Sequence, residues 1–253
     1  MKRCLSLFLS LVMAFTALFA VNTTAYASGW VSSAKSVKYG TWYNEYLDVE
    51  TDSYYYHGCK ITVPARGTVS IRIQQETSTP EFKIYKANNI DSVYASSSGE
   101  GDCRTFVDFG YSSGGGYEWD VQNFLLPAGS YYIAFFSSWQ KEFDFKISYT
   151  PSFSKTSLSK VTAKKKAFNA KWKKCSNVSG YQFQYSTKKN MKSAKTFTFK
   201  GNKTTSKTVS KLKSKKKYYV RVRTYKTVKV NGKNKTYYSK WSSVKTVKTV
   251  KTK

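Results

Sequence analysis

Acidic residues are missing from the whole second half of this 253-residue chain. All fourteen Asp and Glu residues lie before Tyr149, whereas the 103 residues from Pro151 to Lys253 include 29 Lys and two Arg. The segment Ser28 to Thr150 holds ten basic residues beside those fourteen acids, so the net charge of +29 describes neither half. The absence excludes carboxylate ion pairs within the second half. It indicates either a polyanion outside the protein or a surface selected for solubility.

Histidine is almost absent too, because His57 is the only one. One histidine excludes a metal site built from several, and a Ser-His-Asp triad would depend on this same residue. We interpret His57 as a structural residue and expect no enzyme. Four acidic residues in loops have three possible roles: solvated side chains, which we favour, a pair of glycosidase carboxylates, or Ca²⁺ ligands. Apart from such a Ca²⁺ ion, we expect no cofactor. The four residues are Glu100, Asp102, Glu118 and Asp120.

Apolar runs long enough to span a bilayer are absent after Val21. Two basic residues precede the apolar run Leu5 to Val21, and Ala25 and Ala27 then suit a signal peptidase. We predict a cleaved signal peptide over residues 1-27, with an uncleaved signal anchor as the alternative. The protein is expected to be secreted, and any retention at the cell surface would be noncovalent because no lipid or wall-sorting signal follows.

Cysteine is sparse, and three residues remain after the predicted cleavage: Cys59, Cys103 and Cys175. Export permits disulfides, so Cys59 with Cys103 is the candidate pair and Cys175 the free thiol. Three reduced thiols in partly buried strands are the alternative.

Proline is rare and helical periodicity is absent after the signal. Short runs alternate aromatic or β-branched residues with polar ones and break at Gly, Ser and Asn clusters, which is typical of β-strands. We predict an all-β chain of two antiparallel β-sandwich domains in tandem, over residues 28-150 and 151-253. Clear runs in the first half are Gly67 to Gln74, Glu81 to Ala87, Ser130 to Phe136 and Phe143 to Tyr149.

Alternation also fixes the strand register in the second half. A slip of one residue would bury Arg221 and Arg223, so the register is well determined. The residues predicted to face inward are Phe168, Ala170 and Trp172, then Tyr181, Phe183 and Tyr185, then Tyr218, Val220 and Val222.

Three of these elements occur in an informative order: Trp172, the run GYQFQY from Gly180, and Leu212 followed, after five intervening residues, by Tyr218-x-Val-Arg-Val. Together they resemble a fibronectin type III domain, most closely the lysine-rich versions in exported proteins of Gram-positive bacteria. The resemblance implies that Trp172 fills the core and that the Tyr218 hydroxyl bonds back to the chain at a corner. The sequence departs from the family at Lys215, where a Gly often makes the turn.

The first half contains shorter, turn-driven motifs in the segments Asp52 to Tyr56, Ile61 to Ile73 and Leu126 to Ala134. They resemble the pre-peptidase C-terminal type of β-sandwich. Jelly-roll carbohydrate-binding modules share the same pattern, so both remain open.

Lysine dominates the basic half, and a lysine is a flexible point charge that attracts polyanions with little discrimination. Export makes specific nucleic-acid binding a poor choice, so we expect an anionic cell-wall polymer such as teichoic acid, or an acidic polysaccharide. The alternative is a solvated face that resists aggregation. Candidate contacts are Lys164, Lys165, Lys166, Lys171, Lys173, Lys215, Lys216, Lys217, Arg221 and Arg223.

Aromatic residues are abundant, at 21 Tyr, 16 Phe and 6 Trp, and they suit either sheet cores or stacking on sugars. Trp119 and Trp139 flank loops and are the candidates for a carbohydrate platform.

The sequence as a whole predicts an exported, noncatalytic binding or adhesion protein that attaches to anionic polymers through the lysine-rich domain. The alternatives are a carbohydrate-binding module that uses loop aromatics, an enzyme or inhibitor acting through the first half, and a structural protein with a protein partner.

Overall fold

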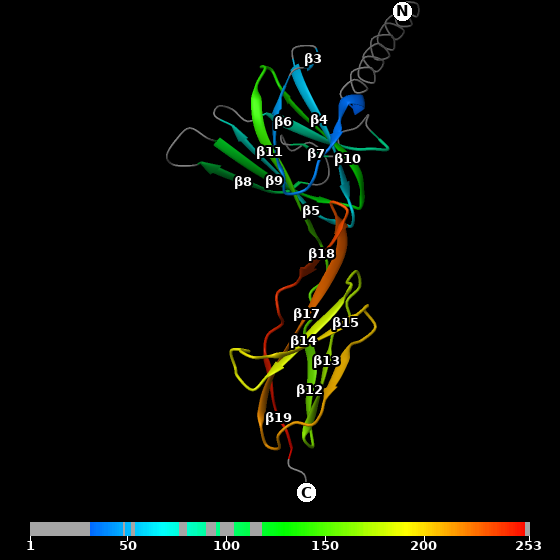
Figure 1. Ribbon diagram of the computed structural model, residues 1–253, viewed down its shortest axis with the longest axis vertical. Helices are drawn as coiled ribbons and strands as arrows, with labels where there is room; N and C mark the ends of the chain where they lie inside the picture. Colours follow the sequence, from blue (N-terminus) through cyan, green and yellow to red (C-terminus); the bar gives the residue numbers. More distant parts are fainter. Residues whose placement is uncertain are drawn as a thin grey trace, which may run out of the picture. The chain divides into compact units, whose positions relative to one another are not determined.

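The computed structural model describes residues 31–47, 49–51, 54–75, 80–89, 95–96, 104–111 and 118–250, so the predicted signal peptide lies outside it. The chain divides into two compact units, Met1–Thr150 and Pro151–Lys253, at the point where acidic residues end. Both are built of β-sheets (Figure 1), which confirms the predicted all-β class. No helix in the described ranges is long and apolar enough to cross a membrane.

The first unit contains two sheets. A six-stranded sheet has the order β1-β4-β10-β6-β7, with β3 beside β4, and a five-stranded sheet has the order β2-β11-β5-β9-β8. The four runs predicted from alternation form β5, β6, β10 and β11. The strands are β1 (Lys35–Ser36), β2 (Trp42–Tyr46), β3 (Val49–Thr51), β4 (Tyr54–Val63), β5 (Gly67–Gln75), β6 (Glu81–Lys86), β7 (Ala95–Ser96), β8 (Arg104–Tyr111), β9 (Glu118–Leu126), β10 (Gly129–Ser137) and β11 (Glu142–Pro151).

Aromatic side chains from both sheets fill the space between them. Phe135 of β10 lies against Phe145 of β11, with ring centroids 4.7 Å apart, and both side chains are fully buried. Phe82 and Phe124 meet edge to face at 5.6 Å. Burying each such ring contributes about 1.5–3 kcal/mol, so this core holds the two sheets together.

The second unit is a sandwich of a three-stranded sheet, β12-β13-β16, and a five-stranded sheet, β15-β14-β17-β18, in which β19 also pairs with β17. The long strand β17 pairs with β18 along its second half and with β19 along its first, so residues 239–244 between them form no strand. The strands are β12 (Leu158–Lys164), β13 (Ala167–Trp172), β14 (Gly180–Ser186), β15 (Lys195–Lys200), β16 (Ser206–Val209), β17 (Lys217–Val230), β18 (Lys233–Tyr238) and β19 (Lys245–Lys248).

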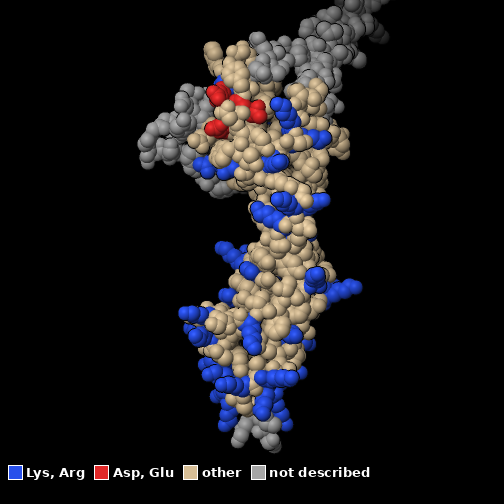
Figure 2. Space-filling model, viewed as in Figure 1, with Lys and Arg blue, Asp and Glu red and all other residues tan. Residues whose placement is uncertain are grey.

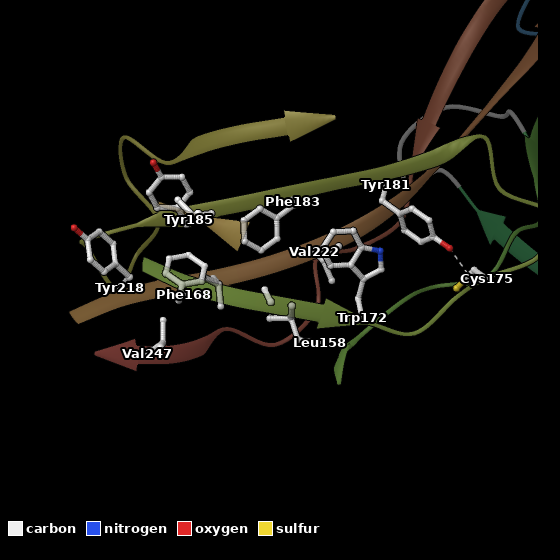
Figure 3. Close-up of a cluster of buried hydrophobic side chains, with 13 residues drawn as sticks. Leu158, Phe168, Trp172, Cys175, Tyr181, Phe183, Tyr185, Tyr218, Val222 and Val247 are labelled. Carbon is white, nitrogen blue, oxygen red and sulfur yellow. Dashed lines mark hydrogen bonds between the residues drawn. The ribbon is translucent and has the colours of Figure 1, made fainter. Parts of the chain in front are cut away.

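The core of the second unit is organised around Trp172, which is 3% exposed (Figure 3). Its ring stacks on Phe183 with centroids 5.8 Å apart. The buried Tyr218 points its hydroxyl at the preceding loop and accepts a hydrogen bond from the Lys213 N–H at 3.2 Å. The chain therefore turns the corner into β17 in the way that the family resemblance implies.

Candidate functional site

One end of the second unit collects lysines from three segments of the chain. They belong to the turn between β12 and β13, the connection between β16 and β17, and the end of β19. All are exposed, and Figure 2 shows basic residues crowded around this end of the unit. We call the group the lysine end; its members are Lys164, Lys165, Lys166, Lys211, Lys213, Lys215, Lys216, Lys217 and Lys248.

Thr249 and Val250 hold these segments together. The buried Thr249 hydroxyl donates to the Lys213 carbonyl at 2.6 Å and accepts from the Lys216 N–H at 3.1 Å. The Val250 N–H donates to the carbonyl of Lys164 at 3.1 Å. A turn and a loop that are distant in sequence are thus fixed against the same stretch of chain after β19.

Like charges face one another across neighbouring strands. Lys217 of β17 is the register partner of Lys248 of β19, and Lys160 of β12 is the partner of Lys171 of β13. Such pairs destabilise a sheet, and no Asp or Glu follows Pro151 to offset them. An anion supplied from outside would relieve this repulsion.

The structure brings together six of the ten predicted polyanion contacts. Lys164, Lys165 and Lys166 join Lys215, Lys216 and Lys217 at the lysine end, whereas Lys171 lies on the outer face of β13 and Lys173 follows its far end. β13 has six residues, so Lys173 lies about 20 Å along the strand direction from the turn. Sequence reasoning missed Lys248, which only the strand pairing brings to this end, and also Lys211 and Lys213, although they lie in the same run as Lys215, KLKSKKK.

The other two predicted contacts, Arg221 and Arg223, are engaged within the sheet. Arg223 donates from Nε and Nη2 to Gln182 Oε1 at 2.9 and 2.7 Å, and Arg221 makes the same pair of bonds to Gln184 at 2.9 and 2.8 Å. Both guanidinium groups also lie over the Trp241 ring, at 4.3 and 4.4 Å from its centroid. Burial lowers the pKa of both groups, which nevertheless remain charged. We therefore leave these arginines out of the proposed contact set.

Trp241 was not singled out by sequence reasoning, although it organises this face. It lies in the irregular stretch between β18 and β19, where two serines bond to β17 through both their backbone N–H groups and their hydroxyl groups. Ser239 Oγ accepts the Thr224 N–H and Ser242 Oγ accepts the Val222 N–H, each at 3.1 Å. The available signal was the sequence Ser-Lys-Trp-Ser after an aromatic strand, since serine hydroxyls can accept hydrogen bonds from the backbone of a neighbouring strand.

The two predicted sugar-stacking tryptophans fall in different places. Trp139 lies in the connection between β10 and β11 and is 74% exposed. Trp119 belongs to β9, but its side chain lies outside the described residues. Only Trp139 therefore has a defined and accessible ring.

Only one cysteine of the predicted Cys59–Cys103 disulfide is described. Cys59 is a free thiol on the core face of β4 with no exposed surface, and Cys103 lies outside the described residues. Cys175 is also free and buried; its thiol donates to the Lys155 carbonyl at 3.3 Å. Burial raises the pKa of both thiols, and the hydrogen bond with Thr156 opposes this at Cys175. Of these two free thiols only Cys59 occupies a strand position, because Cys175 follows the end of β13.

His57 points into the first unit from β4. Its Nδ1 lies 3.6 Å from Glu45 Oε2, and its ring contacts Phe143 and Phe145 at centroid distances of 6.3 and 6.2 Å. The side chain is 16% exposed. These surroundings suit a packed structural residue.

The remaining chemical candidates have no described geometry. The described residues do not include Glu100 and Asp102 or the side chains of Glu118 and Asp120. Among the described residues, no group of three or more His, Cys, Asp or Glu side chains could hold a metal ion. The sequence also contains one Gly-x-Ser-x-Gly motif around Ser112. Its first two residues end β8, and Ser112 lies outside the described residues.

Comparisons with known proteins give only distant structural matches. No protein-family model and no curated protein matches the chain. Solved structures that match include the fn3 domain of human contactin 1, at 13% identity and TM-score 0.32, over 40% of this chain and 83% of that one. An Fn3-like protein from Clostridium thermocellum matches at 19% identity and TM-score 0.25, over 41% of this chain and 97% of its own. A β-1,2-glucanase from Parabacteroides distasonis matches at 12% identity and TM-score 0.32, over 79% of this chain and 31% of its own.

Proposed function

We propose that this chain is an exported, noncatalytic binding or adhesion protein that attaches to anionic cell-wall or extracellular polymers through the lysine end of its second unit. The observation that carries the proposal is the assembly of nine exposed lysines from three segments around the buried Thr249. No side chain of this unit can neutralise them, because it contains no Asp or Glu.

The chemistry of the lysine end suits a flexible polymer of phosphates or carboxylates. Lysine ammonium groups on long stems adapt to many spacings, whereas selective reading of bases or planar carboxylates prefers arginine forks. The two arginines of the unit are occupied by Gln182 and Gln184, so they do not supply such a fork. Binding is therefore electrostatic, strongly dependent on salt and weakly selective among polyanions.

Two matched charge variants of the secreted chain test the proposal. The first replaces four lysines of the lysine end (Lys164→Gln, Lys165→Gln, Lys216→Gln, Lys217→Gln). The second replaces four exposed lysines elsewhere in the same unit (Lys200→Gln, Lys203→Gln, Lys229→Gln, Lys233→Gln). Both lose the same charge, so only position distinguishes them.

The measurement is binding to purified poly(glycerol phosphate) teichoic acid over a range of salt. By analogy with nucleic acids, each lost phosphate contact lowers the slope of log affinity against log salt by about 0.7–0.9. The first variant should lose about four contacts' worth of slope, about 2.8–3.6, and the second little of it. Equal losses in both variants, or a flat response of the unmodified chain, would support a solvated surface without a specific partner.

A further inference from the structure

A second candidate site lies on the first unit, along the outer face of its edge strand β2. Three large apolar side chains of the described part of this unit are exposed: Trp42 at 40%, Tyr46 at 47% and Trp139 at 74%. Exposed apolar residues scattered singly need no explanation, but a group along one edge indicates an interaction surface.

Strand register places Trp42 and Tyr46 on one line, and Trp139 lies in the connection that meets the Tyr46 end of that line. Trp42 and Tyr46 project from the same face of β2, about 13 Å apart, because four residues separate them. The Tyr46 hydroxyl donates to Gln140 Oε1 at 3.3 Å, and Gln140 directly follows Trp139. The Leu47 N–H, bonded to the Lys141 carbonyl at 3.0 Å, fixes this connection against the end of β2.

The polar groups between the rings come from β11. Its register pairs Trp42 with Lys146, Asn44 with Asp144, and Tyr46 with Glu142. Asn44 Nδ2 donates to Asp144 Oδ1 at 3.0 Å, which leaves the amide oxygen of Asn44 and the second carboxylate oxygen as acceptors. The edge therefore alternates flat rings with hydrogen-bonding groups.

The Trp42 ring is held in place by cations. Lys146 Nζ lies 4.5 Å from the ring centroid, and the guanidinium carbon of Arg72 lies 5.8 Å from it. Two cations at the Trp42 end and two carboxylates, Asp144 and Glu142, farther along β11 balance each other. A ligand of one charge sign would be attracted at one end of the line and repelled at the other.

We propose that this line, made of Trp42, Asn44, Tyr46, Gln140 and Trp139, binds a neutral oligosaccharide. Sugar rings present flat C–H faces to aromatic rings, and their hydroxyl groups both donate and accept hydrogen bonds, which matches the alternation along the edge. The site does not depend on the lysine end, and its binding is insensitive to salt because no net charge is neutralised.

The test uses the secreted chain with soluble hexasaccharides of cellulose, xylan, mannan and chitin as probes, followed by calorimetry and tryptophan fluorescence. At least one probe should bind with an affinity unchanged between low and high salt. Trp42→Ala should weaken that binding at least tenfold, and Tyr46→Ala should weaken it by a smaller factor. Trp42→Phe, which keeps a ring, should retain part of the affinity and covers the case in which the alanine variant does not fold.

Two controls separate this site from the lysine end. Tyr238→Ala removes a tyrosine of the second unit that is also 47% exposed, and it should leave oligosaccharide binding unchanged. The four-glutamine variant of the lysine end should also bind the probe normally. Failure of all four probes, or binding that survives both Trp42→Ala and Tyr46→Ala, would overturn the proposal without affecting the teichoic-acid result.

Discussion

Arg223 and Gln182 form a fork on a single oxygen: two nitrogens of the guanidinium donate to the same amide oxygen across two strands, at 2.9 and 2.7 Å. Gln182 in turn donates from Nε2 to Thr198 Oγ1 at 3.4 Å, while Arg223 lies under the rings of Tyr238 and Trp241. A continuous polar row therefore crosses this sheet from β15 to the irregular stretch beyond β18. The row makes the outer face of the sheet a structural element and explains why its cations are not free for a ligand.

Replacing Arg223 by Lys should destabilise the second unit. A lysine keeps the charge but loses the two bonds to Gln182 and the stacking on two rings, at an expected cost of about 1–3 kcal/mol. The measurement is the free energy of unfolding by denaturant. Arg66→Lys, at an exposed turn of the first unit, is the matched control and should cost little. Equal stability of the Arg223 variant and the unmodified chain would contradict the role of the row.

Thr249→Val removes the hydroxyl that joins the segments of the lysine end without changing any charge. Because the Lys213 carbonyl and the Lys216 N–H lose their partner, we expect a loss of about 1–3 kcal/mol in unfolding free energy and weaker binding to teichoic acid. Thr208→Val, on an exposed position of β16, is the control. Unchanged binding by a destabilised Thr249 variant would mean that net charge, and not the arrangement of the lysines, determines affinity.

Lys248→Gln should raise the stability of the second unit at low salt. It removes the repulsion between Lys217 and Lys248, which is expected to contribute about 0.2–1 kcal/mol. The gain should disappear at about 1 M salt, where screening acts within about 3 Å. Thermal unfolding at two salt concentrations measures it. Lys229→Gln, whose cross-strand partner is the uncharged Asn234, should show no such gain.

The buried thiol of Cys59 should resist alkylation in the folded protein and react after unfolding. Burial raises its pKa far above the ordinary value near 8.5, so the folded state keeps the proton while the unfolded state releases it. The contribution of this thiol to the free energy of unfolding is therefore fully present below about pH 8.5 and falls as the pH rises above that value. Peptide mass analysis after iodoacetamide treatment, with and without denaturant, checks the first statement. Rapid labelling of Cys59 in the native protein would contradict it.

Local alternation was sufficient to predict which side chains of the second unit face inward. Phe168, Trp172 and Phe183 are buried as expected, because a period of two leaves only one register that keeps charged residues outside. The same reasoning correctly placed Arg221 and Arg223 on the outer face. It could not identify their partners, because Gln182 and Gln184 become neighbours only through the order of strands in the sheet.

The candidate sites depended even more on topology. Lys248 joins the lysine end because the chain after β19 bonds to a loop more than thirty residues away, which no local pattern encodes. In the first unit, the aromatic side chains of Trp42 and Tyr46 lie on the exposed face of β2, whereas a typical strand turns its large apolar side chains toward the core. A pattern search that assigns aromatics to the core overlooks such a strand.

The position of the lysine end has a geometric consequence for how the second unit would meet a polymer. Its charges surround the tip of the sandwich, where turns and the end of β19 converge, and do not spread over one broad sheet face. A domain attached by its tip stands upright on an anionic layer, with both sheets directed away from the surface. Many copies could then occupy the layer side by side, and the area each one covers would be set by the cross-section of the sandwich and not by its length.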